Sequence, residues 1–244
     1  MSDGSSTPRN PYTRPGFIVA AVVVAAVVAA AIVVLTSGFL SGPAPTPTVS
    51  ETPSEDVDEP SAADRSVCGL DGFERSSSLD AAPENDWELV GTVAAPTSPA
   101  SGPGVIDDDG FRSCFAHTAE GALFAAVNFG ALGTDATLAS RMLELVADGP
   151  GRDAVADAIA SSGGAGGLSG LRAQVAGFRI GAYDGDAATV DLAMNYNDGR
   201  LISVPLKLIW ETGDWKVVFT DAGELPLQPA ALSNLGGYIP WAGA

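Results

Sequence analysis

The feature that most constrains this chain is an unbroken apolar run near its N-terminus. Residues 17–35 read FIVAAVVVAAVVAAAIVVL, nineteen positions without a charged or polar side chain. A helix of that length spans about 28 Å, which is close to the hydrocarbon thickness of a bilayer. A secretory signal peptide usually has a shorter apolar region, and no small-x-small cleavage site follows in TSGFLSGPAP. We therefore expect a transmembrane helix over residues 17–40.

Basic residues around this run set its expected orientation. Arg9 and Arg14 precede it, and the next basic residue is Arg65. Because basic flanks stay on the cytoplasmic side, the disordered tail 1–16 is predicted to be cytoplasmic and the rest extracytoplasmic. The sequence thus predicts a single-pass protein of the cell membrane, attached to the lipid bilayer through residues 17–40.

The chain is strongly acidic, with 12 Lys and Arg against 30 Asp and Glu and a formal net charge of −18. A field of that sign repels phosphate backbones, so nucleic acid is excluded as a partner of the exported part. The acidic residues are scattered rather than grouped, which indicates solubility more than a specific cationic partner.

A stalk and an arm are predicted to follow the span. Residues 41–66 are rich in Pro, Ser, Thr and acids and are expected to be a disordered stalk. Residues 67–113 are expected to be irregular, apart from a short strand pattern around Trp87. We call residues 67–113 the arm. The two cysteines, Cys68 and Cys114, lie on the exported side, where a disulfide would attach the arm to the following domain. Two free buried thiols are the alternative.

Residues 114–224 show helical periodicity first and strand periodicity afterwards. Thr118 suits a helix N-cap, and Glu120 in the first turn suits the helix dipole. Helices are predicted from Thr118 to Gly130 and over about 135–147 and 151–160. Strands are predicted over about 171–183, 190–196, 200–211 and 215–219, with turns at Asn197-Asp198-Gly199 and Thr212-Gly213-Asp214. The predicted fold class is α+β, with about three helices before a four-stranded antiparallel meander. An apolar tail, 225–244, follows.

This order of elements resembles that of the NTF2-like superfamily, and the last strand carries the segment W-K-V-V-F. The fold of that superfamily is a cystatin-like cone, in which a curved sheet wraps around N-terminal helices. With one span and an exported domain, the chain resembles the VirB8-like and TcpC-like components of conjugation and type IV secretion machines. Segments 87–104 and 114–123 are similar to membrane proteins of actinobacterial mobile elements. The TcpC-like proteins carry two such units and this chain has one. The resemblance implies an exported module for assembly and contact, without a catalytic motif.

Candidate catalytic and metal sites are weak. Cys114 and His117 are spaced like a nucleophile and its base, but the disulfide would occupy Cys114. His117 is instead expected to hydrogen-bond locally, so that His117→Ala leaves the fold intact. One histidine and two cysteines fall short of a metal site, and Asp107, Asp108 and Asp109 lack the spacing of an EF-hand loop. We predict no metal and no cofactor.

Two further patterns also argue against an enzyme. The glycine-rich segment 161–170 lacks the lysine of a phosphate-binding loop. Asp191 and Tyr196 fall on opposite faces of their strand, so they do not line one cavity, and Asp191 is expected to face solvent. The chain is accordingly predicted not to be an enzyme.

Aromatic residues provide the candidate binding positions. The strand residues could line a pocket in the cone, or simply fill the core. The tail residues could pack back across the domain, which we favour, or present an apolar patch to a partner. The positions are Phe178, Tyr183, Trp210 and Trp215 in the strands and Tyr238 and Trp241 in the tail.

The first function hypothesis from the sequence is a membrane-anchored extracytoplasmic assembly protein of a conjugative-transfer or type IV secretion-like apparatus. Its partners would be other membrane or secretion-apparatus proteins, with a second copy of the chain as a further candidate. The second hypothesis is a ligand-binding or sensory ectodomain that uses the cone. The third is an NTF2-like hydrolase or isomerase, which would need polar residues converging inside the cone.

Overall fold

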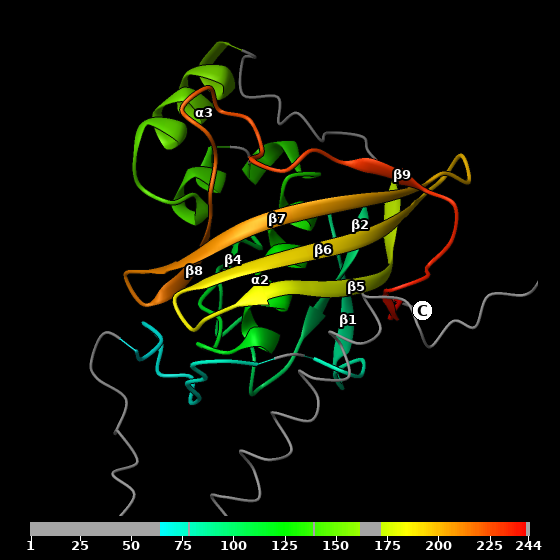
Figure 1. Ribbon diagram of the computed structural model, residues 1–244. Coiled ribbons are helices and arrows are strands. Elements are labelled where there is room, and N and C mark those ends of the chain that lie inside the picture. The colour runs from blue at the N-terminus through cyan, green and yellow to red at the C-terminus, as the bar shows by residue number, and fades with distance from the viewer. Residues whose placement is uncertain (1–63, 78, 139, 162–171, 243–244) are drawn as a thin grey trace, which may run out of the picture. The chain divides into compact units, whose positions relative to one another are not determined.

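Long antiparallel strands of alternating polarity form the centre of the computed structural model, which describes residues 64–77, 79–138, 140–161 and 172–242. The strand order is β10-β5-β6-β7-β8, and β9 pairs with β7 beyond the end of β8 (Figure 1). The strands are β5 (Ala173–Tyr183), β6 (Ala187–Tyr196), β7 (Leu201–Glu211), β8 (Asp214–Val217), β9 (Ala230–Leu232) and β10 (Ile239–Pro240).

Both predicted hairpin turns are confirmed. Glu211 pairs with Asp214 across a two-residue turn in which Thr212 and Gly213 both have positive φ, as the twist of a tight hairpin requires. The other turn lies between β6 and β7, where Gly199 has a φ of 83°. These local signals fix the register that places alternate residues of each strand on the inner face of the sheet.

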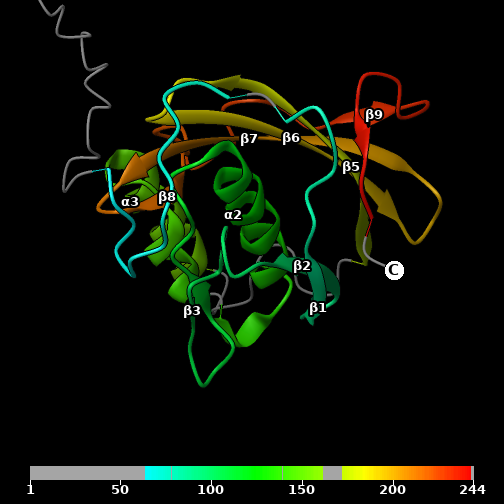
Figure 2. The same cartoon turned by 90° about the horizontal axis from the view of Figure 1, so that it is seen from below.

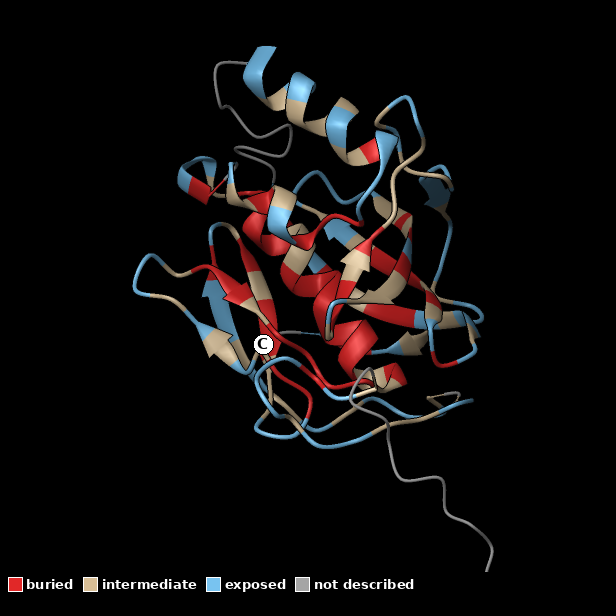
Figure 3. Ribbon diagram, turned by 90° about the vertical axis from the view of Figure 1, so that its left-hand side faces the viewer, coloured by how far each residue is buried: buried red, intermediate tan, exposed pale blue. Residues whose placement is uncertain are grey.

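Helix α2 (Ala119–Leu132) lies against the inner face of this sheet (Figures 1 and 2). The predicted cap is confirmed, because the Thr118 hydroxyl accepts from the Gly121 amide at 3.0 Å. Most of α2 is buried, including Leu123 and Phe124, since the arm covers the side that faces away from the sheet (Figure 3). A helix that is apolar on nearly all sides is a central core element.

The predicted fold class is wrong. The described residues contain two α-helices, α2 and α3 (Pro150–Ser161), and a six-stranded sheet rather than a four-stranded meander. The predicted helix over 135–147 is two short 3-10 helices, η2 (Ala136–Leu138) and η3 (Arg141–Leu145). One reason is local, because the Asp135 carboxylate binds both the amide and the hydroxyl of Thr137 and so competes with helical hydrogen bonds. The architecture is mostly β and is not the helix-rich cone of the NTF2-like fold.

The arm is more regular than predicted. It forms two small antiparallel sheets, one of β1 (Asp86–Val90) with β2 (Val93–Thr97) and one of β3 (Val105–Ile106) with β4 (Arg112–Ser113). The predicted strand around Trp87 is confirmed as β1. The predicted disulfide is also confirmed, with Cys68 and Cys114 joined and their Cα atoms 6.1 Å apart.

Removing this disulfide should destabilise the domain. Replacing Cys68 and Cys114 by serine is expected to lower the free energy of unfolding by about 4 kcal/mol, because the bond closes a long loop. Urea denaturation measures this loss, and limited proteolysis should show faster cleavage within residues 64–77. Reduced wild-type protein is the control and should match the variant. Equal protease resistance of the oxidised and serine forms would contradict the expectation.

The expected membrane span falls on residues that the structure does not describe. No helix in the described part of the chain is long and apolar enough to cross a membrane. Residues 17–40, on which that prediction was made, lie outside the described residues, as do the tail 1–16 and nearly all of the stalk 41–66.

The hydrophobic core and the disulfide lie between residues 64 and 242. The buried core runs from Val90 to Trp241, and the partly buried Leu79 packs against it. A fragment of residues 41–244 therefore keeps the whole core and should fold without the N-terminal segment. We use this fragment in the experiments proposed below.

Candidate functional site

An apolar cavity of about 390 Å³ lies between the inner face of the sheet, α2 and α3. Small-molecule sites in proteins have volumes of roughly 300–1,000 Å³, so the cavity is within the range for a ligand. Its lining residues share one property, which is that none carries a charge. They are Val93, Ala126, Val127, Phe129, Gly130, Ala131, Gly133, Met142, Val155, Ile159, Leu192, Met194, Tyr196, Val204, Leu206, Phe219, Leu225 and Pro229.

The sheet supplies one wall by simple alternation. Leu192, Met194 and Tyr196 are every second residue of β6, and Val204, the partner of Leu192, and Leu206 are every second residue of β7. Because successive side chains of a strand point to opposite faces, these five share the inner face. The period-two pattern of the sequence therefore already defines this wall.

Helix α2 supplies a second wall, and its small residues leave the space open. Ala126, Gly130 and Ala131 line the cavity where larger side chains would fill it. A Cβ atom added at Gly130 would meet no atom within 4 Å. The cavity is thus a consequence of alanine and glycine on this stretch of α2.

Helix α3 covers the cavity without burying itself. Its first turn is tightly packed at Gly151, where an added Cβ would lie 2.4 Å from the carbonyl oxygen of Phe219, and Ala154 lies beside Gly223. Val155 and Ile159, one helical turn apart, face the cavity and are half-buried, and the rest of α3 is exposed or half-buried (Figure 3).

The six aromatic residues predicted as contact positions lie elsewhere. None of them lines this cavity. Phe178 and Trp241 are buried; Trp241 stacks on Phe124 and meets Phe178 edge-to-face. Trp210 and Trp215 contact each other edge-to-face at 5.4 Å. The Tyr183 hydroxyl donates to the Glu74 carbonyl at 3.0 Å, and burial raises the pKa of this hydroxyl. Tyr238, the sixth, lies over the outer face of the sheet.

The C-terminal tail packs back on the domain, as the sequence analysis favoured. Its strand β10 pairs with β5, and Trp241 is only 6% exposed. The Tyr238 hydroxyl donates to the Asp191 carboxylate at 2.7 Å, and Ser203 and Arg179 bind the same carboxylate. Asp191 is therefore buried beneath the tail, and the expectation that it faces solvent is wrong. It does lie on the face opposite Tyr196, as alternation predicted.

His117 is not a surface residue with local partners. Its ring is fully buried and stacks on Trp210 with a centroid distance of 3.8 Å. Nδ1 lies 2.9 Å from the carbonyl oxygen of Asp64, and Nε2 lies 2.8 Å from that of Gly185. These partners are far away in the sequence, so the expected local bond is wrong. Since Cys114 is in the disulfide, His117 has no thiol to activate.

Replacing His117 should therefore weaken the domain. His117→Ala is expected to lower the free energy of unfolding by about 2–4 kcal/mol, because it removes a buried stacked ring and its hydrogen bonding to a backbone carbonyl group. His117→Phe keeps a stacking ring and should recover part of the loss. Urea denaturation of fragment 41–244 measures both variants. An unchanged denaturation midpoint for His117→Ala would support the earlier view that this residue is dispensable.

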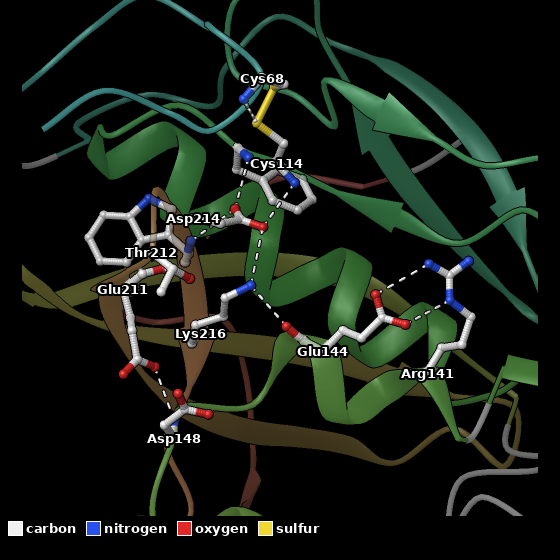
Figure 4. A network of polar contacts seen from close by, with 11 residues as sticks. Cys68, Cys114, Arg141, Glu144, Asp148, Glu211, Thr212, Asp214 and Lys216 are labelled. Atoms are coloured by element: carbon white, nitrogen blue, oxygen red, sulfur yellow. Dashed lines mark hydrogen bonds and ion pairs between the residues drawn. A yellow bond between two sulfur atoms is a disulfide. The ribbon is translucent and has the colours of Figure 1, made fainter. Parts of the chain in front are cut away.

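A second polar centre joins the disulfide region to β8 (Figure 4). The Asp214 carboxylate accepts hydrogen bonds from the backbone amides of Cys114, Phe115 and Trp215, each at 2.9 Å. Burial raises the pKa of Asp214, and the ammonium of Lys216, 3.7 Å away, acts in the opposite direction. These hydrogen bonds hold the segment before α2 in place. The donors to the Asp214 carboxylate are groups of the protein itself, so we assign Asp214 a structural role.

The acidic loop of Asp107, Asp108 and Asp109 lies against a basic side chain. Arg141 forms ion pairs with Asp107 at 2.7 Å and Asp109 at 3.0 Å, so a cation of the protein itself balances the acidic loop. No cluster of metal-ligating side chains occurs within the described ranges. Residues 162–171, nearly all of the glycine-rich segment, lie outside them.

The cavity could not be located from the sequence, because no sequence motif encodes the distance between α3 and the sheet that leaves this space open.

Comparisons with known proteins add a family and nothing further. Residues 48–240 match the family described as "Domain of unknown function (DUF8175)". No curated protein and no solved structure matches the chain.

Proposed function

The chain belongs to the DUF8175 family, and on that premise we propose that its folded domain binds an apolar small molecule in the cavity between α2, α3 and the sheet. The cavity carries the proposal. Native cores are close-packed, so a space of about 390 Å³ is much larger than an ordinary packing defect. The hollow is partly open to solvent and its lining is mainly apolar, which is typical of binding sites for small apolar molecules.

Helix α3, which covers the cavity, supports the same proposal. Val155 and Ile159 of α3 face the cavity but are only half-buried, so a bound molecule would complete their packing. The stabilisation that follows is the hydrophobic effect, which is roughly proportional to the apolar area removed from water. Binding is therefore expected to strengthen the attachment of α3 to the rest of the domain.

We place this domain outside the cytoplasm, as part of the same proposal. The Cys68–Cys114 disulfide supports it, because such bonds persist in oxidising compartments. The family match is to a domain of unknown function, so the role in a conjugation or secretion apparatus stays a prediction from the sequence. The packed position of Trp241 and of β10 also removes the main apolar surface that an assembly role would have used.

Titration of fragment 41–244 with N-phenyl-1-naphthylamine tests the proposal. This uncharged probe fluoresces strongly in apolar surroundings. We expect saturable fluorescence with one site per chain and a melting temperature that rises with probe concentration, because the probe binds the folded state. A linear, non-saturating signal together with an unchanged melting temperature would contradict the proposed function.

A further inference from the structure

We infer that the cavity selects an uncharged, flexible hydrocarbon-chain molecule with at most one hydroxyl-type polar group, an inference that rests on the proposed function. The class includes long-chain alcohols and similar neutral lipids, and it excludes fatty-acid carboxylates and lipid phosphates. The inference concerns which chemistry the site accepts, so it can fail while ligand binding itself stands.

Among the described residues, the lining contains no group that could neutralise a charged ligand. All eighteen lining residues are uncharged, and Tyr196 is the one whose side chain carries a hydroxyl. Moving an ionised carboxylate from water into such surroundings without a partner costs several kcal/mol. A ligand that enters the cavity completely must therefore be neutral, and a single hydroxyl can use Tyr196 as its partner.

The cation next to Tyr196 does not change this conclusion. The Arg200 guanidinium lies over the Tyr196 ring at 5.6 Å, which makes it the natural candidate for holding an anionic headgroup. It is already paired with Asp198 at 2.7 Å, and its side chain is 66% exposed. A solvated cation that is neutralised by its own neighbour gives little to an anion. The net charge of −18 further disfavours anionic ligands.

The lining also indicates a flexible ligand. Met142 of η3 and Met194 of β6 contribute unbranched thioether side chains from two different elements. Methionine adapts its shape to irregular spaces and contacts. Together with the loosely packed α3, these walls can follow a bending chain, whereas a fixed wall would favour a rigid ring system.

Competition between two molecules of equal chain length tests the inference. Fragment 41–244 is loaded with N-phenyl-1-naphthylamine at pH 8, and tetradecan-1-ol and tetradecanoate are compared as competitors below their aggregation limits. The alcohol is expected to displace the probe at a concentration at least about tenfold lower than the carboxylate, because the carboxylate must remain hydrated or enter without a partner. The same titration on Gly130→Trp, which fills the cavity, is the control for location.

Each outcome has a defined meaning. Displacement by the alcohol alone, lost in Gly130→Trp, supports the inference. Equal or better displacement by tetradecanoate overturns it and leaves the proposed function intact, as does displacement by neither competitor while the probe remains bound at a saturable site. Alcohol displacement that persists in Gly130→Trp also overturns it, because the chain then binds elsewhere. Failure of the probe itself to bind sinks the proposed function instead.

Discussion

Gly130→Trp should weaken binding of N-phenyl-1-naphthylamine by more than about tenfold, a loss of 1.4 kcal/mol or more, while the fragment stays folded. A Cβ at this position meets no atom within 4 Å, so the indole can enter the cavity without displacing the backbone. An aromatic side chain of this size occupies much of a 390 Å³ space and excludes the probe. Fluorescence titration gives the affinity, and thermal denaturation confirms the fold.

Gly130→Ala is the matched control for this prediction. It replaces the same glycine at the same helical position by a residue with a Cβ atom, but it adds only a methyl group to the open space. We expect it to bind the probe normally and to gain about 0.5–1 kcal/mol of stability, since glycine is unfavourable within a helix. Equal probe affinity in the tryptophan and alanine variants would show that binding does not occur in the cavity.

Asp214→Ala is expected to produce the largest loss of stability, about 3–5 kcal/mol, because a buried acceptor with several donors is removed. Three backbone amides, those of Cys114, Phe115 and Trp215, would be left without their acceptor. Lys216, whose side chain is only 14% exposed, would also lose its neighbouring negative charge. Urea denaturation of fragment 41–244 measures the loss.

The comparison for Asp214 is another aspartate of a hairpin turn. Asp198 accepts from the Arg200 amide at 3.1 Å, which holds the pKa of its carboxyl below the usual range, but it is exposed to solvent. Water can replace the carboxylate at such a position, so Asp198→Ala should be far less destabilising than Asp214→Ala. Losses of similar size in the two variants would mean that the hydrogen bonds of Asp214 do not fix the segment before α2.

Local sequence signals predicted the elements whose partners are close along the chain. Asn197-Asp198-Gly199 and Thr212-Gly213 marked their turns because few residues other than glycine adopt positive φ easily. Thr118 marked the start of α2 by its own hydrogen bond to Gly121. The two cysteines could be paired because no others compete with them.

Features with distant partners were not predicted. Asp191 is buried because Tyr238, 47 residues later, covers it, and β9 and β10 are too short to show a strand period. His117 is bound through carbonyl groups 53 and 68 residues away. For the strand aromatics the sequence left two alternatives, a pocket lining or the core, and Phe178 and Trp215 are in the core. The actual cavity forms where α2 carries alanine and glycine.

Methyl NMR of the methionines tests the central claim most directly. Met142 and Met194 line the cavity, and they are the only methionines after residue 40. Fragment 41–244 labelled with ¹³C at the methionine methyl groups gives these two signals, with the initiating methionine as an internal control. Tetradecan-1-ol is expected to shift both cavity signals in a saturable manner and to leave the control unchanged. Unchanged signals of Met142 and Met194 at saturating alcohol would contradict ligand binding in this cavity.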